Sequence, residues 1–407
     1  MLTSKSTYDV IIVGSGPAGA TAAYFLAVNG VKPLIIEKEK FPRYKTCGGG
    51  VVSRVKDLLP FDLDEILELS CMQAEVYDKG SRCHFTSKRA YPIIMMTMRE
   101  NFDSFLLSKA IEQGAVLRDK CEVRNFKITG NGIEINTGTE NFITKFLIAA
   151  DGSNGIFSKR FNSKDDVVRL PALEYEIFTN TDTYLRFSNK ARFDFGFPEN
   201  GYGWVFPKKD HLSVGVVGMT KLNCNLNEMF SKYINQLQIK EILNSEKHGY
   251  TIPILKRKKV FNHAGILLTG DAAGFADPIT GEGISSAILS GRIAAESIIS
   301  ANFDENRVAS LYNRAIYETL MKEYSCAKTI STLIYNFPKL RSFIFRSYGQ
   351  KLTETITDIF SGKRKYSALF NSPHFYYKLV KYYLINKMQW YTNKANPSME
   401  INKITQN

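Results

Sequence analysis

The first forty residues alternate between apolar runs and a glycine-rich segment. Residues 8–13 form a β-branched apolar run, which is typical of a buried parallel strand. The segment GSGPAG follows, and an alanine-rich helical pattern then extends to Asn29-Gly30, a helix-stop signal. A second apolar run, residues 31–36, ends at Glu37. The pattern therefore predicts a strand, a tight turn, a helix and a second parallel strand.

Later segments combine buried strands or helices with polar turns. Residues 98–114 predict an amphipathic helix with Asn101 as its N-cap and Gly114 as its stop. Residues 141–150 and 264–269 predict two further buried strands, and the second leads through GDAAG into a helix that opens near Gly283. Residues 165–260 alternate apolar and polar positions between frequent turn residues, which predicts an antiparallel sheet.

The composition is that of a globular protein with excess positive charge. The 407 residues are 44% hydrophobic and 23% charged, and the net charge is +13. These values exclude a disordered chain and favour acidic partners such as phosphates or anionic lipid head groups. Because no targeting segment or bilayer-length apolar run is visible, we expect a cytoplasmic protein, with peripheral contact to the inner face of the membrane as a further expectation.

The cysteines and histidines do not form a metal-binding pattern. Six cysteines lack a CxxC pair and are too sparse for a disulfide scaffold, and the five histidines are not clustered. We therefore expect no metal, no iron–sulfur cluster and a reducing environment.

The glycine-rich turn has the spacing of a dinucleotide-binding loop. Gly14 allows the tight turn, Gly16 allows close approach of a pyrophosphate, and Gly19 allows the helix to pack on the strand. Pro17 and Ala18 complete the loop at the helix N-terminus, where backbone N–H groups favour phosphate. Glu37 would accept hydrogen bonds from a ribose diol and repel a 2′-phosphate, which leaves NAD or FAD as the ligand.

Further motifs choose between these two ligands. The chain resembles the FAD-dependent oxidoreductases of the para-hydroxybenzoate hydroxylase fold, through GSGPAG, Arg99, Ala150-Asp151-Gly152 and Gly270-Asp271. Within that fold it resembles the geranylgeranyl reductase family. The narrower resemblance rests on three motifs, which are FPRYKTCGGG (41–50), GYGWVFPK (201–208) and GDAAGFADPITGEGI (270–284).

The resemblance implies a set of FAD-binding residues. Gly14, Gly16, Gly19 and Glu37 would hold the ADP half, and Asp271 would bind the ribityl–phosphate region. Arg99 and Val123 would line the cofactor cleft. The residues expected beside the flavin ring are Cys47, Gly48, Gly50, Gly283 and Ile284, and Cys47 is also a candidate catalytic residue by position, although a small buried thiol often only packs.

The expected fold is α/β, with a Rossmann-like FAD-binding domain, an inserted antiparallel-sheet substrate domain and a helical C-terminal region. The expected boundaries are 1–165 and 261–330 for the discontinuous FAD-binding domain, 166–260 for the substrate domain with a contribution from 50–95, and 331–407 for a basic helical region.

Tyr202, Trp204 and Phe206 alternate and should point to one face of a strand. Aromatic residues at this spacing usually pack in a core, but they would also form the wall of an apolar substrate tunnel. Flavin-dependent halogenases have a similar WxWxIP motif, and the replacement of its first Trp by Tyr202 and of its Ile by Phe206 favours the reductases.

The resemblance implies a reductase that saturates isolated C=C bonds of a prenyl lipid or prenylated quinone. Two alternatives stay open, a flavin monooxygenase or halogenase acting on an aromatic metabolite, and a flavin-stabilised binding protein without turnover. No second GxGxxG is present, so the electrons would come from transient NAD(P)H or from a ferredoxin-type protein donor, to which a basic surface would be complementary.

Much of the positive charge lies near the C-terminus. Residues 339–407 contain twelve Lys and Arg against three acidic residues, and residues 375–391 mix basic with aromatic positions in a helical pattern. Contact with an anionic membrane surface and a solvated helical cover on the substrate domain are both open. Nucleic-acid binding is not expected, because no recognition motif is present.

Overall fold

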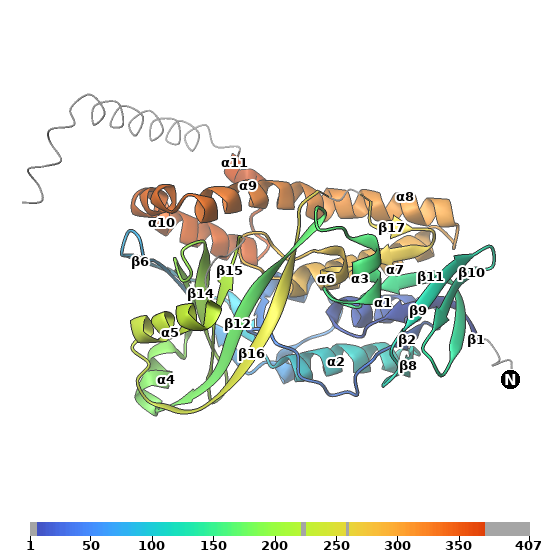
Figure 1. Ribbon diagram of the computed structural model, residues 1–407, viewed down its shortest axis with the longest axis horizontal. Coiled ribbons are helices and arrows are strands. Elements are labelled where there is room, and N and C mark those ends of the chain that lie inside the picture. Colours follow the sequence, from blue (N-terminus) through green and yellow to red (C-terminus); the bar gives the residue numbers. More distant parts are fainter. Residues whose placement is uncertain (1–5, 221–224, 258–259, 371–407) are drawn as a thin grey trace, which may run out of the picture.

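The computed structural model describes residues 6–220, 225–257 and 260–370 (Figure 1). Its first sheet has parallel strands at its centre, where β1 (Ser6–Val13) lies between β2 (Leu34–Ile36) and β11 (Asn141–Ala149). β18 (Ile266–Leu268) pairs with β11, and β8 (Val116–Arg118) pairs with β2, both in parallel. Antiparallel strands complete this eight-stranded sheet: β9 (Asn125–Thr129), β10 (Gly132–Asn136) and β17 (Asn262–His263).

Three helices that pack together accompany the parallel strands. α1 (Pro17–Ala27) contacts both α2 (Arg99–Glu112) and α7 (Ile284–Ser300). α7 crosses α1 closely at Gly291, where an added Cβ would stand 2.1 Å from the carbonyl oxygen of Ala18. Two short helices follow strand ends, α3 (Ile156–Phe161) and α6 (Gly270–Ala273).

The second sheet has seven strands in the order β16-β12-β15-β14-β13-β5-β6. All its neighbours are antiparallel except β13 and β5, which run parallel. The helices α4 (Thr181–Phe187) and α5 (Leu226–Leu237) belong to the same part of the chain. The strands are β5 (Gln73–Asp78), β6 (Cys83–Lys88), β12 (Val167–Thr179), β13 (Lys190–Phe195), β14 (Gly201–Pro207), β15 (Leu212–Gly218) and β16 (Ile242–Leu255).

A small third sheet carries the residues after the first βαβ unit. β7 (Ile94–Met96) pairs antiparallel with β3 (Gly50–Val52) and with β4 (Leu69–Cys71). Two 3₁₀ helices, Ser53–Asp57 and Asp64–Ile66, connect β3 to β4. This arrangement places the glycine-rich residues before β3 between the two larger sheets.

The C-terminal helices run along one side of both large sheets (Figure 1). They are α8 (Glu305–Ile316), a π-helical turn (Tyr317–Met321), α9 (Lys322–Asn336), α10 (Pro338–Phe360) and α11 (Ser367–Phe370). α10 packs against β5 and β6 of the second sheet. The basic and aromatic segment 375–391 lies outside the described residues.

The α/β fold class is confirmed, with two differences of detail. Asn101 is not the N-cap of α2, because the helix begins at Arg99 after an extended Met98. The Arg99 side chain is only 5% exposed and turns back onto Asp103 one turn later, which fixes the helix start at Arg99. The second strand begins at Leu34 instead of residue 31.

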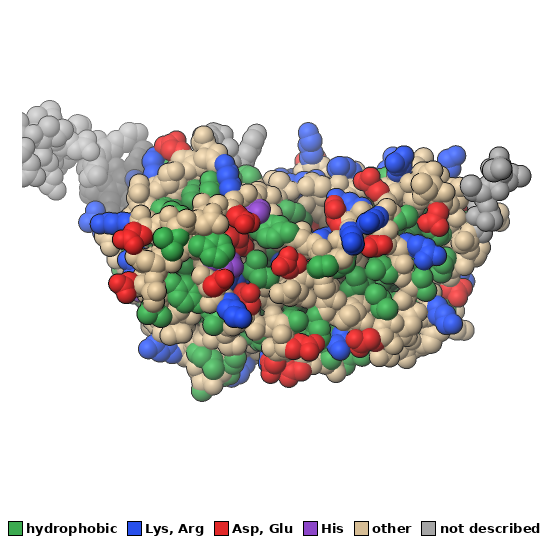
Figure 2. Space-filling model, turned by 90° about the horizontal axis from the view of Figure 1, so that it is seen from below, with side chains coloured by type: hydrophobic (Ala, Val, Ile, Leu, Met, Phe, Trp, Pro, Cys, Tyr) green, Lys and Arg blue, Asp and Glu red, His purple; other side chains and the backbone are tan. Residues whose placement is uncertain are grey.

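The described residues contain no helix that is both long enough and apolar enough to cross a membrane. On the face shown in Figure 2, basic and acidic side chains are interspersed. The positive charge therefore does not collect in one large patch on that face.

Candidate functional site

A cavity opens between the glycine-rich loops and the second sheet. Its volume is about 180 Å³, and it is open to solvent. Its lining comes from segments far apart in the chain: the loop before α1, residues 45–50, the start of α2, strands β12, β13, β14 and β16, residues 276–284, and Phe360 of α10. The structure thus brings most of the predicted site residues to one place.

The three glycines of GSGPAG meet different neighbours. Gly14 has a φ of +96°, and an added Cβ would stand 2.3 Å from the carbonyl oxygen of Ala150. A Cβ on Gly19 would stand 1.9 Å from the carbonyl oxygen of Gly14. A Cβ on Gly16 would meet only the Arg43 guanidinium, 3.7 Å away. Gly14 and Gly19 are therefore required by the fold itself, whereas Gly16 keeps open the space in front of the α1 N-terminus.

Glu37 lies behind this loop and does not line the cavity. Its carboxylate is 5% exposed and accepts hydrogen bonds from the backbone N–H and the hydroxyl of Ser15, at 2.9 and 2.7 Å. The other carboxylate oxygen accepts the backbone N–H of Glu39 at 3.0 Å. Through these contacts Glu37 stabilises the conformation of the loop before α1. A contact between Glu37 and a ribose stays a prediction.

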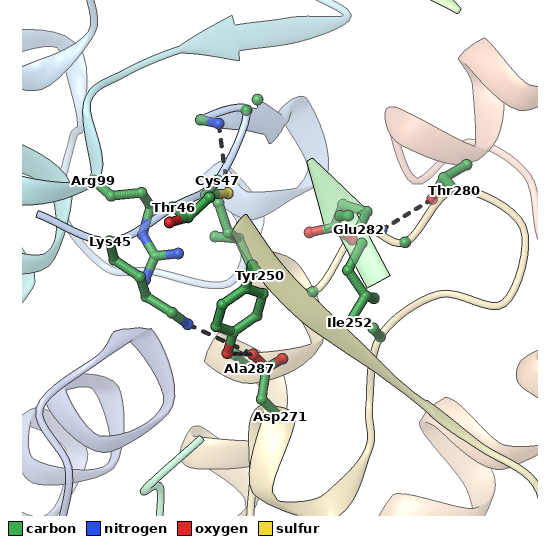
Figure 3. A pocket seen from close by; sticks show the side chains of 18 of the residues that line it. Lys45, Thr46, Cys47, Arg99, Tyr250, Ile252, Asp271, Thr280, Glu282 and Ala287 are labelled. Carbon is green, nitrogen blue, oxygen red and sulfur yellow. Dashed lines mark hydrogen bonds and ion pairs between the residues drawn. The ribbon is translucent and has the colours of Figure 1, made fainter. Parts of the chain in front are cut away.

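Three positively charged side chains, Arg43, Lys45 and Arg99, lie near the loop that precedes α1. Figure 3 shows Lys45 and Arg99. Arg99 donates two hydrogen bonds to Asp103, at 2.9 and 2.8 Å, and Arg43 pairs with the same carboxylate at 3.1 Å. Lys45 pairs with Asp271 at 3.5 Å. Three cations therefore face two carboxylates, which leaves excess positive charge where a pyrophosphate would lie.

Sequence reasoning assigned only Arg99 of these three cations. Arg43 and Lys45 lie within the FPRYKTCGGG motif, so the signal was in the sequence but carried no individual role. Their roles follow from Asp103 and Asp271, which lie on distant elements and bring the two side chains to the loop.

The second glycine-rich segment forms another side of the cavity. Asp271 accepts a hydrogen bond of 2.9 Å from the Tyr250 hydroxyl on β16. Gly283 is the N-cap of α7 and Ile284 is its first residue, and the Glu282 carboxylate accepts the Ser285 backbone N–H at 2.7 Å. Both line the cavity together with Asp271, so the N-terminus of α7 lies beside the same space as the N-terminus of α1.

Aromatic side chains of β14 form an apolar wall. Tyr202 and Trp204 are 6% and 7% exposed, and together with Phe206 they line the cavity. The Trp204 ring lies over Gly215 of β15, where an added Cβ would stand 2.1 Å from the ring. Phe193 of β13 and Phe360 of α10 extend the wall, and neither was among the predicted site residues.

The CGGG segment lies directly under this wall. A Cβ on Gly48 would stand 2.9 Å from the Phe206 ring and 3.0 Å from Trp204 Nε1. Gly50 is within similar reach of Phe206. Cys47 lines the cavity, is partly buried and accepts a long hydrogen bond of 3.5 Å from the Gly49 backbone N–H. These glycines therefore let the loop pass close beneath the aromatic rings.

Val123 is not part of the cavity. Its side chain is buried in the hydrophobic core, with 8% of its surface exposed, and it does not line the cavity. That Val123 lines the cofactor cleft therefore stays a prediction.

An acidic residue that the sequence analysis missed also lines the cavity. Glu174 of β12 is 1% exposed and accepts a hydrogen bond from the Ser213 hydroxyl. Burial, together with the nearby charge of Glu176, raises the pKa of Glu174 to about 7. Glu174 lies across Gly215 of β15 from Trp204 of β14, so the signal in the sequence was a polar residue at a buried position of β12.

The residues present fit FAD. A space kept open by Gly16, the uncapped N-terminus of α1 and an excess of positive charge suit a pyrophosphate. The adjoining apolar wall suits a flat ring with an apolar substrate above it.

Comparison with known proteins agrees with this arrangement. A family model described as an FAD binding domain matches residues 7–170. A digeranylgeranylglycerophospholipid reductase of Thermoplasma acidophilum is 30% identical over 349 residues, covering 78% of this chain and 84% of that protein. A chloroplastic geranylgeranyl diphosphate reductase of rice is 28% identical over 333 residues, covering 75% of this chain and 70% of that protein.

Solved structures share the fold. The crystal structure of a geranylgeranyl bacteriochlorophyll reductase-like protein from Thermoplasma acidophilum superposes with a TM-score of 0.71 at 23% identity, covering 88% of this chain and 92% of that one. A flavin-dependent brominase superposes with a TM-score of 0.67 at 21% identity, covering 88% and 94%. The structural likeness therefore does not separate reductases from halogenases, whereas the sequence relatives do. The chain belongs to the geranylgeranyl reductase family of FAD-binding oxidoreductases.

Proposed function

We propose that this protein is an FAD-dependent reductase that saturates isolated C=C bonds in the prenyl chain of a lipid or of a prenylated quinone. The relatives named as reductases of geranylgeranyl groups support this proposal. The observation that carries it is the aromatic wall of β14, which continues without a break into the FAD-binding loops. A prenyl chain is apolar and flexible, so a wall of aromatic rings would bind it without polar contacts.

Each group of residues would have its own task. Gly16, the ends of α1 and α7, and the cations Arg43, Lys45 and Arg99 would hold the cofactor, which supplies a hydride when reduced and bound. The wall formed by Tyr202, Trp204 and Phe206 would orient the alkene and exclude water. An unactivated alkene has no carbonyl to polarise, so its alignment with the hydride donor decides the rate.

The electron donor belongs to the same proposal. NAD(P)H would act transiently, or a ferredoxin-type protein would dock on a basic part of the surface, in keeping with the net charge of +13. Anaerobic reduction of the bound flavin by NADH, NADPH and reduced ferredoxin, each added separately, distinguishes these donors.

The test is an anaerobic reaction of the flavin-loaded protein with geranylgeranyl lipids and prenylquinones. A reductase yields products that gain one pair of hydrogens for each saturated bond, as measured by mass spectrometry, without oxygen. Products that form only with oxygen, and carry oxygen or halogen, would show a monooxygenase or halogenase instead. Flavin that is reoxidised at the same rate with and without any prenyl substrate would also contradict the proposal.

A further inference from the structure

Glu174 has an unusual position for a carboxyl group. It lies on the cavity side of β12 in register with Gly215 of β15, which is covered by the Trp204 ring. Its Oε1 accepts from the Ser213 hydroxyl, and Ser213 in turn lies 3.3 Å from Trp204 Nε1. Its Oε2 has no hydrogen-bond partner within 3.5 Å among the described residues, although it is buried. An acidic group is thus held against the aromatic wall with one oxygen that no described side chain within hydrogen-bond distance satisfies.

The surroundings favour a protonated carboxyl. Burial and the neighbouring Glu176 raise the pKa of Glu174, whereas Ser213, the cation Lys208 and the backbone N–H of Cys47 lower it. These opposing effects give Glu174 a pKa of about 7. A substantial share of the molecules would therefore carry a protonated Glu174 at neutral pH. On the adjacent strand β16, His248 is opposite Glu174, and its ring contacts the Tyr44 ring in a tilted arrangement, with 4.3 Å between centroids.

A chain of polar side chains connects this region to solvent. His211 contacts Glu176 through Nε2 at 2.9 Å and Asp210 through Nδ1 at 2.7 Å. The Asp210 side chain is 70% exposed, whereas those of His211 and Glu176 are buried. Glu176 is two residues from Glu174 on the same strand and therefore on the same face. The hydrogen-bonded chain thus leads from water to Glu176, the neighbour of Glu174 on this face of β12.

We propose that Glu174 gives the proton that completes saturation of the alkene, an inference that rests on the proposed function. The O–H bond of Glu174 breaks and a C–H bond forms at one alkene carbon, using the π electrons, while the other carbon receives the hydride of the reduced flavin. The resulting carboxylate takes up a proton from water along Asp210, His211 and Glu176. Cys47, the candidate by sequence position, then acts only as a small group beneath the wall.

The first experiment compares Glu174→Gln with wild type and with Cys47→Ala. Each flavin-loaded protein is reduced anaerobically and mixed with a prenyl substrate that wild type saturates, and the first turnover is followed. Glu174→Gln keeps the size of the side chain but removes its acidic proton, so we expect a loss of about 100-fold or more in this step. Flavin content and flavin reduction by the donor should stay at the wild-type level, and Cys47→Ala should change the first turnover by much less.

The second experiment uses pH and does not depend on the stability of Glu174→Gln. Because the donor must be protonated, the first-turnover rate of wild type should fall as pH rises through about 7. Glu176→Gln removes a negative charge that raises the pKa of Glu174, so the fall should move to lower pH. Ser213→Ala removes a hydrogen bond that lowers this pKa, so the fall should move to higher pH. Infrared titration of the part of the carboxylic acid band that Glu174→Gln removes, as distinct from the part that belongs to other buried acids such as Asp151, gives the same shifts without turnover.

The outcomes separate the two proposals. A wild-type rate in folded Glu174→Gln, a large loss in Cys47→Ala, or pH profiles that do not move in the two neighbouring variants overturns the role of Glu174 alone. Wild-type protein that saturates no prenyl substrate overturns the proposed function, and the role of Glu174 with it.

Discussion

Arg341 and Asp78 form an almost completely buried ion pair, although 263 positions separate them in the chain. Arg341 Nε lies 2.8 Å from Asp78 Oδ1, and the two side chains are 2% and 0% exposed. Arg341 also donates to the backbone carbonyl of Glu199 at 2.7 Å. The pair fastens α10 to the end of β5 in the second sheet, so the C-terminal helices are part of the same folded body as the cavity.

Loss of one partner of this pair should be costly. Arg341→Met leaves the Asp78 carboxylate buried without its cation, which should lower the free energy of unfolding by about 3–5 kcal/mol. The double variant Asp78→Asn with Arg341→Met buries no charge and should recover a large part of that loss. Urea denaturation of wild type and of both variants checks this. Equal stability of the single and double variants would show that the unpaired Asp78 charge is not the cause of the loss in stability.

The nucleotide-binding half of the fold could be predicted from the sequence, but the ion pair between Arg341 and Asp78 could not. Gly14, Gly16 and Gly19 are close together in the chain, and their spacing alone specifies the turn between β1 and α1. Arg341 and Asp78 each look like ordinary surface residues in the sequence, because their burial depends on how two distant elements pack. Glu174 could not be predicted for the same reason, because its environment is formed by β14, β15 and the loop at Cys47.

Gly16 offers a test of the cofactor site that does not disturb the fold. A side chain there would meet only Arg43 within the protein, so Gly16→Val should fold and yet block the pyrophosphate position. We expect a folded protein whose FAD affinity falls at least tenfold, or about 1.4 kcal/mol. The absorbance of bound flavin and the circular dichroism of the apoprotein measure the two effects.

Gly19→Val is the matched control, because its side chain would collide with the Gly14 carbonyl and should prevent folding. A yellow Gly16→Val protein with full flavin would show that the phosphates bind elsewhere.

Asp151 should make stability depend on pH. Burial raises its pKa from 3.8 to about 7, although the carboxylate also accepts the Phe157 backbone N–H at 2.8 Å. The folded protein therefore keeps a proton that the unfolded chain releases above about pH 4, and the stability that this proton contributes is lost as pH rises through 7.

Asp151→Asn cannot ionise, so its stability relative to wild type should rise between pH 4 and 7, on the order of 4 kcal/mol. Thermal unfolding across this range, with the same flavin content in both proteins, is the measurement. The exposed Asp165→Asn should show no such trend, and a difference between Asp151→Asn and wild type that stays constant with pH would contradict the expectation.

Trp204 and Val205 are neighbours on β14 that face opposite sides of the sheet. Trp204 lines the cavity, whereas Val205 is buried in a separate hydrophobic cluster beside α5. Trp204→Ala should keep its flavin but change the preference between prenyl chains of different length by about tenfold or more. Val205→Ala should lower stability without changing that preference. Competition between two prenyl chain lengths in one reaction measures this preference directly. An unchanged preference in Trp204→Ala would show that the aromatic residues of β14 only pack in the core.

The basic C-terminal segment should bind anionic membranes, and the structure shows where it has to be cut to test this. Removing everything after Pro338 would break the pair of Arg341 with Asp78 and remove Phe360 from the cavity wall, so any loss of binding would be ambiguous. A truncation after residue 370 keeps these contacts. The segment that it removes contains five Lys and one acidic residue, together with six Tyr and Trp.

Each Lys near an anionic surface contributes about 1 kcal/mol at most, and salt weakens this attraction. We therefore expect full-length protein to sediment with vesicles that contain phosphatidylserine, less so as salt increases, and hardly with neutral vesicles. The truncated protein should bind both kinds weakly, and full-length protein with the five Lys changed to Gln should behave like it, which separates charge from aromatic insertion. Equal sedimentation of full-length and truncated protein, or equal binding to neutral and anionic vesicles, would mean that the enzyme meets its insoluble substrate by a different route.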